Sequence, residues 1–151
     1  MVKKIYNVIF MSVIGNGTNT VGETFFYDWT QIPDVPYKVT FSFVSGIATL
    51  TNTQIATIFI DISQSNNQVA TSQNTLNAQN RGAFLGSLVY SGTGASNYLS
   101  ANITTNPPTF LNGRPRTNNV FIEIHQNTAT LQSNYTPVTG AYTLILSFEE
   151  L

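Results

Sequence analysis

Large apolar residues recur at every second position along much of this chain, which is the spacing of β-strands and not of helices. The pattern is clearest over residues 37–43 and over residues 142–148, near the C-terminus. Because alternate side chains of a strand point to opposite faces of its sheet, one set in each segment faces the core. We therefore predict that five side chains of these two segments are buried: Phe41, Phe43, Leu144, Leu146 and Phe148.

Six further segments have a similar apolar character and are bounded by Gly, Pro and Asn clusters: residues 4–14, 23–29, 55–62, 82–90, 98–103 and 120–125. Residues 55–62 are apolar on both faces, which predicts a strand in the middle of its sheet. Trp29 is in phase with Phe25 and Tyr27, so we expect its side chain in the core. Residues 4–14 follow a lysine pair as in a signal peptide, but polar residues interrupt the run and no cleavage site closes it. We interpret them as the first strand.

Eight strands and no helix longer than a turn indicate an all-β chain, and 151 residues suit one domain spanning residues 1–151. An immunoglobulin-like sandwich and a jelly roll both fit this strand count. The chain has no cysteine, so the Cys…Trp…Cys framework of the former is missing. Connections of very unequal length favour the latter. We predict a single eight-stranded jelly-roll sandwich of two antiparallel sheets.

The longest predicted connection, residues 63–81, contains only two large apolar residues, Val69 and Leu76. Two such residues cannot offset the entropy of fixing so many backbone units. We therefore expect contacts with neighbouring molecules to order this connection.

The composition is short of charge: only 9% of residues are charged, the net charge is −1, and Asn, Thr, Ser and Gln make up 58 of the 151 residues. A surface that is polar through amides and hydroxyls gives little electrostatic repulsion between copies. Such a surface suits a protein that packs against neighbours. Six scattered cations do not form the basic face that nucleic-acid binding requires, and no run of apolar residues is long enough for a transmembrane helix. We expect neither a nucleic-acid partner nor a membrane span.

The segment from residue 106 to residue 119 combines three prolines, an Asn-Gly pair and two of the six cationic residues. Its prolines exclude a helix and predict a connection of fixed shape between two strands. The pair Asn112-Gly113 tolerates positive φ and is typical of a tight reversal. Arg114 and Arg116 provide fork-shaped donors for carboxylates or carbonyls on a neighbour. An alternative is that the arginines pair within their own chain, with Asp34 or with Glu149 and Glu150.

Candidate catalytic chemistry is sparse. His125 is the only histidine and lies in a predicted strand, no Gly-x-Ser-x-Gly motif occurs, and seven acidic residues offer a carboxylate pair only by accident. Neither a calcium-loop pattern nor a His-rich or thiolate metal motif is present, and no phosphate-binding Gly loop occurs. We predict no enzyme activity, no cofactor and no metal. A carbohydrate-binding sandwich with Trp29, Tyr90 or Tyr98 as a stacking platform is the alternative function.

Three segments in order resemble the single jelly-roll minor capsid proteins of large icosahedral double-stranded-DNA viruses. They are residues 37–43, the Asn-Pro-Pro…Arg-Pro…Asn segment that leads into residues 120–124, and residues 142–149. The resemblance covers about two-thirds of the chain, and the proline-containing segment is its distinctive part. The penton protein, also a single jelly roll, is a close relative that fits too.

The resemblance implies a non-enzymatic component of the virion shell, made in the host cytoplasm. Its partners would be other capsid proteins and copies of itself, in a trimer or another cyclic oligomer. If so, the proline-containing segment lies at a subunit contact, because its prolines reduce the entropy lost on binding. The predicted interface residues are Asn106, Pro107, Pro108, Arg114, Pro115, Arg116 and Asn119.

Overall fold

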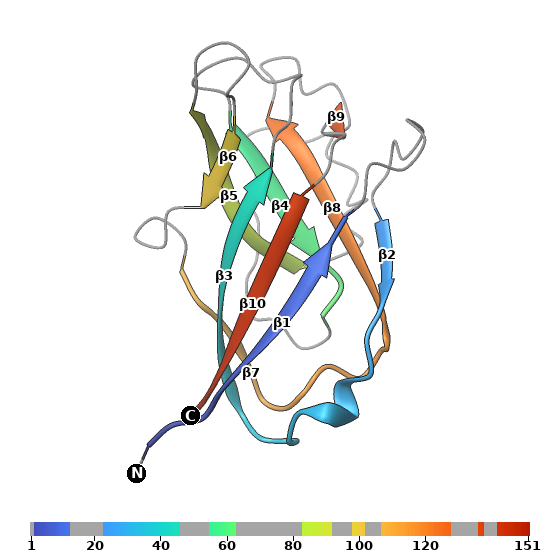
Figure 1. Ribbon diagram of the computed structural model, residues 1–151, viewed down its shortest axis with the longest axis vertical. Helices are drawn as coiled ribbons and strands as arrows, with labels where there is room; N and C mark the ends of the chain where they lie inside the picture. Colours follow the sequence, from blue (N-terminus) through green and yellow to red (C-terminus); the bar gives the residue numbers. More distant parts are fainter. Residues whose placement is uncertain are drawn as a thin grey trace, which may run out of the picture.

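The structure is a computed structural model that describes residues 2–12, 23–45, 55–62, 83–91, 98–101, 107–127, 136–137 and 142–151. These residues form antiparallel strands and one single-turn 3₁₀ helix, η1 (Trp29–Gln31), so the chain is all-β. Eight strands follow one another along a hydrogen-bonded path (Figure 1): β1 (Ile5–Met11), β10 (Tyr142–Glu150), β3 (Tyr37–Ser45), β6 (Tyr98–Ala101), β5 (Ala83–Ser91), β4 (Ile55–Ile60), β8 (Asn119–Asn127) and β2 (Glu23–Phe26). Two short strands pair beside this path, β7 (Thr109–Leu111) with β3 and β9 (Thr136–Pro137) with β8.

The strand pairing is nested along the chain. The first strand of the path pairs with the last strand of the chain, β1 with β10, and β2 pairs with β8. Inside these pairs, β3 pairs with β6 and β4 with β5. The contacts of β10 with β3 and of β4 with β8 then join neighbouring pairs into larger sheets. Each of these pairings is antiparallel.

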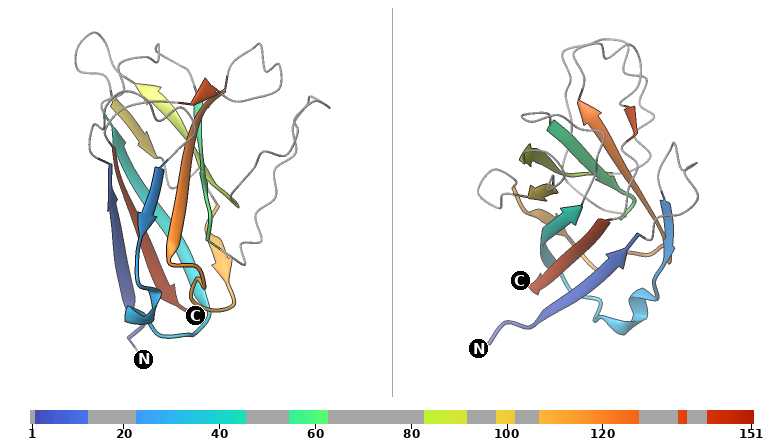
Figure 2. Two further views of the ribbon diagram at one scale, coloured as in Figure 1. Left: turned by 90° about the vertical axis from the view of Figure 1, so that its right-hand side faces the viewer. Right: turned by 45° about the horizontal axis from the view of Figure 1, so that its top comes forward.

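The two ends of the strand path face each other. The ring of Phe10 in β1 lies 5.4 Å from the ring of Phe25 in β2, although these strands are at opposite ends of the path. Figures 1 and 2 accordingly show β1, β10 and β3 lying over β4, β5 and β8. One cluster of buried side chains fills the space between them, with members from β1, β3, β4, β5, β8 and β10, and Phe25 of β2 packs against it.

The predicted core is confirmed. Phe41 and Phe43 are 6% and 5% exposed, and Leu144, Leu146 and Phe148 are fully buried. Along β10 the burial alternates residue by residue over the first eight positions, as expected for a strand with one face on the core. The central position predicted for residues 55–62 is confirmed too, since β4 pairs with β5 on one edge and with β8 on the other.

Two of the predicted element boundaries are wrong. The strand predicted over residues 23–29 ends at Phe26, because the Asp28 side chain accepts hydrogen bonds from Thr30 and begins the turn η1. The segment predicted as a strand-free connection, residues 106–119, contains β7. Asn106 and the long connection over residues 63–81 lie outside the described residues.

Candidate functional site

The candidate site is the part of the proline-containing segment from Pro107 to Asn119, which contains β7 and leads into β8. In Figure 1 it lies at the lower end of the molecule, together with η1 and both chain termini. The termini are close in space as well as in the view, because the amide of Glu150 donates to the carbonyl of Lys4. Leu151 donates to the carbonyl of Pro36, which ties the C-terminus to the connection that precedes β3.

β7 fixes the first half of the segment against β3. Leu111 lies opposite Tyr37 and Thr109 opposite Val39 in an antiparallel ladder. The side chains of Thr109 and Leu111 are each 1% exposed, whereas Phe110 between them is 42% exposed. Buried and exposed side chains therefore alternate here as in the longer strands, but over only three residues. Such a short run bounded by prolines carries no period that a sequence reading can detect.

The second half of the segment is fixed by two of its backbone carbonyls, which accept hydrogen bonds from residues at the start of η1 and just before it. Trp29, 1% exposed, donates its indole Nε1–H to the carbonyl of Thr117 at 3.0 Å. Tyr27 donates its amide to the carbonyl of Asn118 at 2.9 Å. A buried indole requires an acceptor for its N–H, so the segment and the Trp29 side chain satisfy each other.

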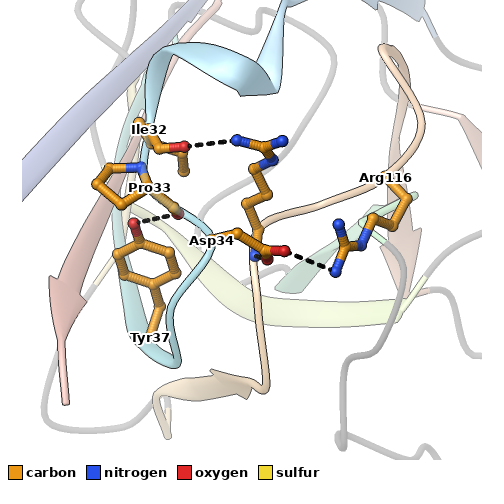
Figure 3. A network of polar contacts seen from close by, with 6 residues as sticks. Ile32, Pro33, Asp34, Tyr37 and Arg116 are labelled. Carbon is orange, nitrogen blue, oxygen red and sulfur yellow. Dashed lines mark hydrogen bonds and ion pairs between the residues drawn. The ribbon is translucent and has the colours of Figure 1, made fainter.

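Asp34 holds the centre of the segment (Figure 3). Its Oδ1 accepts from the amide of Arg114 at 3.2 Å, and its Oδ2 lies 2.9 Å from Nη2 of Arg116. The Arg114 side chain points to the other side, where Nη1 donates to the carbonyl of Ile32 at 3.2 Å. Both arginines are thus in contact with the connection between η1 and β3, 82 to 80 residues earlier in the chain.

Gly113 allows this approach. A Cβ atom at this position would lie 2.7 Å from Oδ1 of Asp34, a separation that real Cβ atoms essentially never show. The residue is buried, but its φ is not in the left-handed region. Gly113 therefore does not use the positive φ that the Asn112-Gly113 pair tolerates, and the close approach of Asp34 is what requires a glycine at this position.

The charges of the site follow from these contacts. The amide of Arg114 holds the pKa of the Asp34 carboxyl below its usual value. Desolvation opposes this effect, and the guanidinium of Arg116 lowers the pKa further. The pKa of Asp28 is lowered by the hydroxyl and the amide of Thr30. Burial raises the pKa of Tyr37 to about 12, and its hydroxyl donates to the carbonyl of Pro33 at 2.7 Å. All three residues keep one charge state at neutral pH, so the connection has a fixed shape there.

Six of the seven predicted interface residues lie in the described part of the chain, and their exposure differs. Pro115 is buried and Pro108 and Arg114 are half-buried, so these three help to fix the backbone. Pro107, Arg116 and Asn119 are exposed, as are Thr117 and Asn118. The segment is therefore an exposed surface on a firmly held backbone, and the predicted donors Arg114 and Arg116 are engaged within the chain.

Charge is concentrated at this end of the molecule. Nine of the thirteen charged residues lie in the terminal strand ends, η1 and the two connections that meet here: Lys3, Lys4, Asp28, Asp34, Lys38, Arg114, Arg116, Glu149 and Glu150. Lys3 and Lys38 pair with Glu149, and Tyr6 donates to Glu150. At the other ends of β1 and β3, the chain continues into residues 13–22 and 46–54, which contain no charged residue at all.

The other candidate residues do not assemble into a second site among the described residues. Trp29 is buried, so it offers no stacking platform for a sugar, while the side chains of Tyr90, Tyr98 and His125 lie outside the description. Within the described ranges, no group of His, Asp and Glu side chains could hold a metal ion. The same ranges contain no helix with the length and apolar character needed to cross a membrane.

One buried polar contact lies away from the segment, where β10 begins. The Tyr142 hydroxyl and Oε2 of Glu23 are both buried and neither makes a well-formed hydrogen bond within the described chain. Burial raises the pKa of Tyr142 far above its usual value, and the adjacent Glu23 carboxylate raises it further. The Tyr142 ring stacks on Phe43, which explains its position by packing and not by its hydroxyl.

Sequence reasoning missed the role of Asp34 as the anchor of the segment, although it named this residue among the possible partners of the arginines. The one sequence feature that points to this contact is Gly113 beside Arg114. It indicates a close approach of the backbone to another residue, but it does not identify that residue. Comparison of the chain with protein-family models, curated proteins and solved structures found no match.

Proposed function

We propose that this chain is a non-enzymatic structural component of an icosahedral virus capsid, built on a single jelly roll and assembling with copies of itself and with other capsid proteins in the virion. The nested strand pairing is the observation that carries this proposal. A jelly roll is a long antiparallel hairpin rolled up, so its first strand pairs with its last and the following strands pair inward. The pairs β1 with β10, β2 with β8, β3 with β6 and β4 with β5 follow that rule.

Jelly rolls serve chiefly as viral capsid proteins, lectins and cupins. A cupin holds its metal in a cluster of ligands inside the roll, and within the described ranges no such cluster occurs. A lectin stacks sugars on exposed aromatic side chains, and Trp29, one of the three candidate platforms, is buried. A weakly charged surface with a net charge of −1 favours close packing between copies, which supports the capsid function.

The segment from Pro107 to Asn119 is the proposed contact with a neighbouring capsid subunit. The ladder of β7 with β3, the hydrogen bonds from Trp29 and Tyr27, and the Asp34 anchor already hold it, so a partner would not have to order it. Association then costs less conformational entropy than it would for a loose loop. Its exposed residues combine an apolar side chain, Phe110, with the amides of Asn118 and Asn119 and the Arg116 guanidinium.

Size-exclusion chromatography and negative-stain imaging of the purified chain test the proposal directly, with a trimer or another closed ring expected. The double variant Arg114→Ala/Arg116→Ala should then weaken assembly. The matched control is Lys3→Ala/Lys38→Ala, which removes the same charge from two side chains that pair with Glu149. A chain that remains monomeric, both alone and when mixed with the other capsid proteins of its virion, would contradict the proposal. So would an arginine double variant that melts several degrees lower yet assembles normally.

A further inference from the structure

The free edge of β1 is the one long strand edge at the described surface that is both unpaired and apolar. β1 pairs with β10 on one side, and within the described residues no strand pairs with its other side. Figure 2 shows β1 at the margin of its sheet. Its outward side chains Ile5, Ile9 and Met11 are 58%, 56% and 66% exposed. Ile145 of β10, opposite Ile9, extends this apolar strip.

The hydrogen bonds at the two ends of β1 show which backbone groups face outward. Lys4 accepts from the amide of Glu150, and Ser12 donates to the carbonyl of Tyr142, so the even-numbered residues point their backbone groups at β10. Residues of a strand alternate in this respect. The amides and carbonyls of Ile5, Asn7, Ile9 and Met11 therefore point to the free edge, four donors and four acceptors in line.

Soluble proteins protect such an edge with a lysine, a proline or a bulge. The sequence of β1, Ile-Tyr-Asn-Val-Ile-Phe-Met, contains none of these, and its register with β10 is regular throughout. An occupant that satisfies this edge must itself be a strand, since only a strand presents alternating donors and acceptors at the same spacing.

We infer that β1 pairs antiparallel with β1 of a second copy of this chain across a twofold axis at Val8. In that register Ile5 lies opposite Met11 of the other copy and Asn7 opposite its Ile9, so all the outward backbone groups are satisfied and two sheets merge into one. This inference deepens the proposed function by naming one surface through which copies associate, separate from the segment between β7 and β8.

Charge selects the antiparallel arrangement and a second copy. β1 is uncharged, and the charged residues next to it along the chain are Lys3 and Lys4 at one end, where Glu149 of β10 pairs with Lys3. A parallel pair would place four lysines side by side. The antiparallel pair separates Lys3 from its counterpart by ten residues along the strands, about 33 Å at 3.3 Å per residue, which is well beyond a Debye length.

The size of the contact predicts that β1 pairing by itself holds two copies together only weakly. β1 is about 23 Å long, and a strip two strands wide is about 10 Å across, so each copy contributes roughly 230 Å² in projection. Stable complexes bury about 800 Å² per partner. The pairing should therefore be concentration-dependent in solution and be completed by the other contacts of a shell.

Cysteine cross-linking tests the register, because the natural chain has no cysteine. Residues opposite each other in a hydrogen-bonded antiparallel pair have Cα atoms about 5.5 Å apart, which suits a disulfide. A mixture of Ile5→Cys and Met11→Cys chains should form a disulfide-linked dimer under mild oxidation. Either variant alone serves as the control, since two copies of residue 11 would be about 20 Å apart. Equal cross-linking of the single variants, or none in the mixture, would overturn the inference.

Sedimentation equilibrium provides the second measurement. Ile9→Lys places two like charges about 8 Å apart across the axis, within the screening length, and should raise the dimer dissociation constant about tenfold or more. Phe26→Lys, which changes an exposed apolar residue on β2, outside both proposed contacts, should leave it unchanged. A dissociation constant unaffected by Ile9→Lys in a folded chain would refute the pairing. The cross-link and the effect of Ile9→Lys report the β1 contact alone. They can fail while the chain still forms a ring through the segment between β7 and β8, and they can succeed when no ring forms.

Discussion

Gly113→Ala tests the close approach on which the candidate site depends. The added Cβ would lie 2.7 Å from Oδ1 of Asp34, so the carboxylate must move and release the amide of Arg114. Overpacking a buried position costs about 1–3 kcal/mol. Replacing glycine by alanine at a φ that alanine accepts returns about 0.4–1 kcal/mol through the unfolded chain. We expect a net loss of about 1 kcal/mol, or about 2–4 °C in melting temperature for a chain of this size.

The same substitution in an Asp34→Ala background should have the opposite sign. Without the carboxylate, the next atom, Nη2 of Arg116, lies 3.6 Å from the new Cβ, which is ordinary van der Waals contact. Gly113→Ala should then stabilise the chain by about 0.4–1 kcal/mol. Trp29 is the only tryptophan and is buried beside the segment, so its fluorescence reports unfolding of this region in urea.

A double-mutant cycle of the four chains isolates the contact from other effects of each change. We expect Gly113→Ala to lower the free energy of unfolding in the natural chain and to raise it in the Asp34→Ala chain. If Gly113→Ala costs the same free energy with and without the Asp34 carboxylate, the close approach to this carboxylate does not explain the glycine.

Three further predictions concern the core and the charges. Phe41→Ala should lower the free energy of unfolding by about 3–5 kcal/mol, because Phe41 is 6% exposed in the centre of β3; a loss under about 1 kcal/mol in urea unfolding would contradict its burial. The lowered pKa of Asp34 stabilises the folded chain above the unfolded value of 3.8, and this contribution disappears as the pH falls through the lower folded pKa. The melting temperatures of the natural chain and Asp34→Asn should therefore differ by a constant amount above about pH 5 and converge below about pH 4, and a gap that persists at low pH would exclude the charge as its cause. Tyr142→Phe removes a buried hydroxyl that lacks a good partner, so calorimetry should find stability unchanged or higher by about 1 kcal/mol, whereas a clear loss would reveal a hydrogen bond to Glu23.

Local pattern was sufficient for the strands and most of the core. The alternation over residues 37–43 and 142–148 predicted which face of β3 and β10 is buried, because a strand has a period of two and the core admits only apolar side chains. The phase of Trp29 predicted its burial even though the residue lies in a turn and not in a strand. Both predictions of burial depend only on residues that lie within a few positions of one another in the sequence.

The arrangement at the candidate site was decided by tertiary structure alone. The sequence provided the prolines, the glycine and the two arginines, and it left Asp34, Glu149 and Glu150 as equal partners for them. The fold selects Asp34 because β7 pairs with the start of β3, which places Arg114 and Arg116 beside the connection after η1, while Lys3 and Lys38 take Glu149. Contacts between residues some 80 positions apart leave no periodic trace in the sequence, so only the folded chain shows why Gly113 cannot be larger.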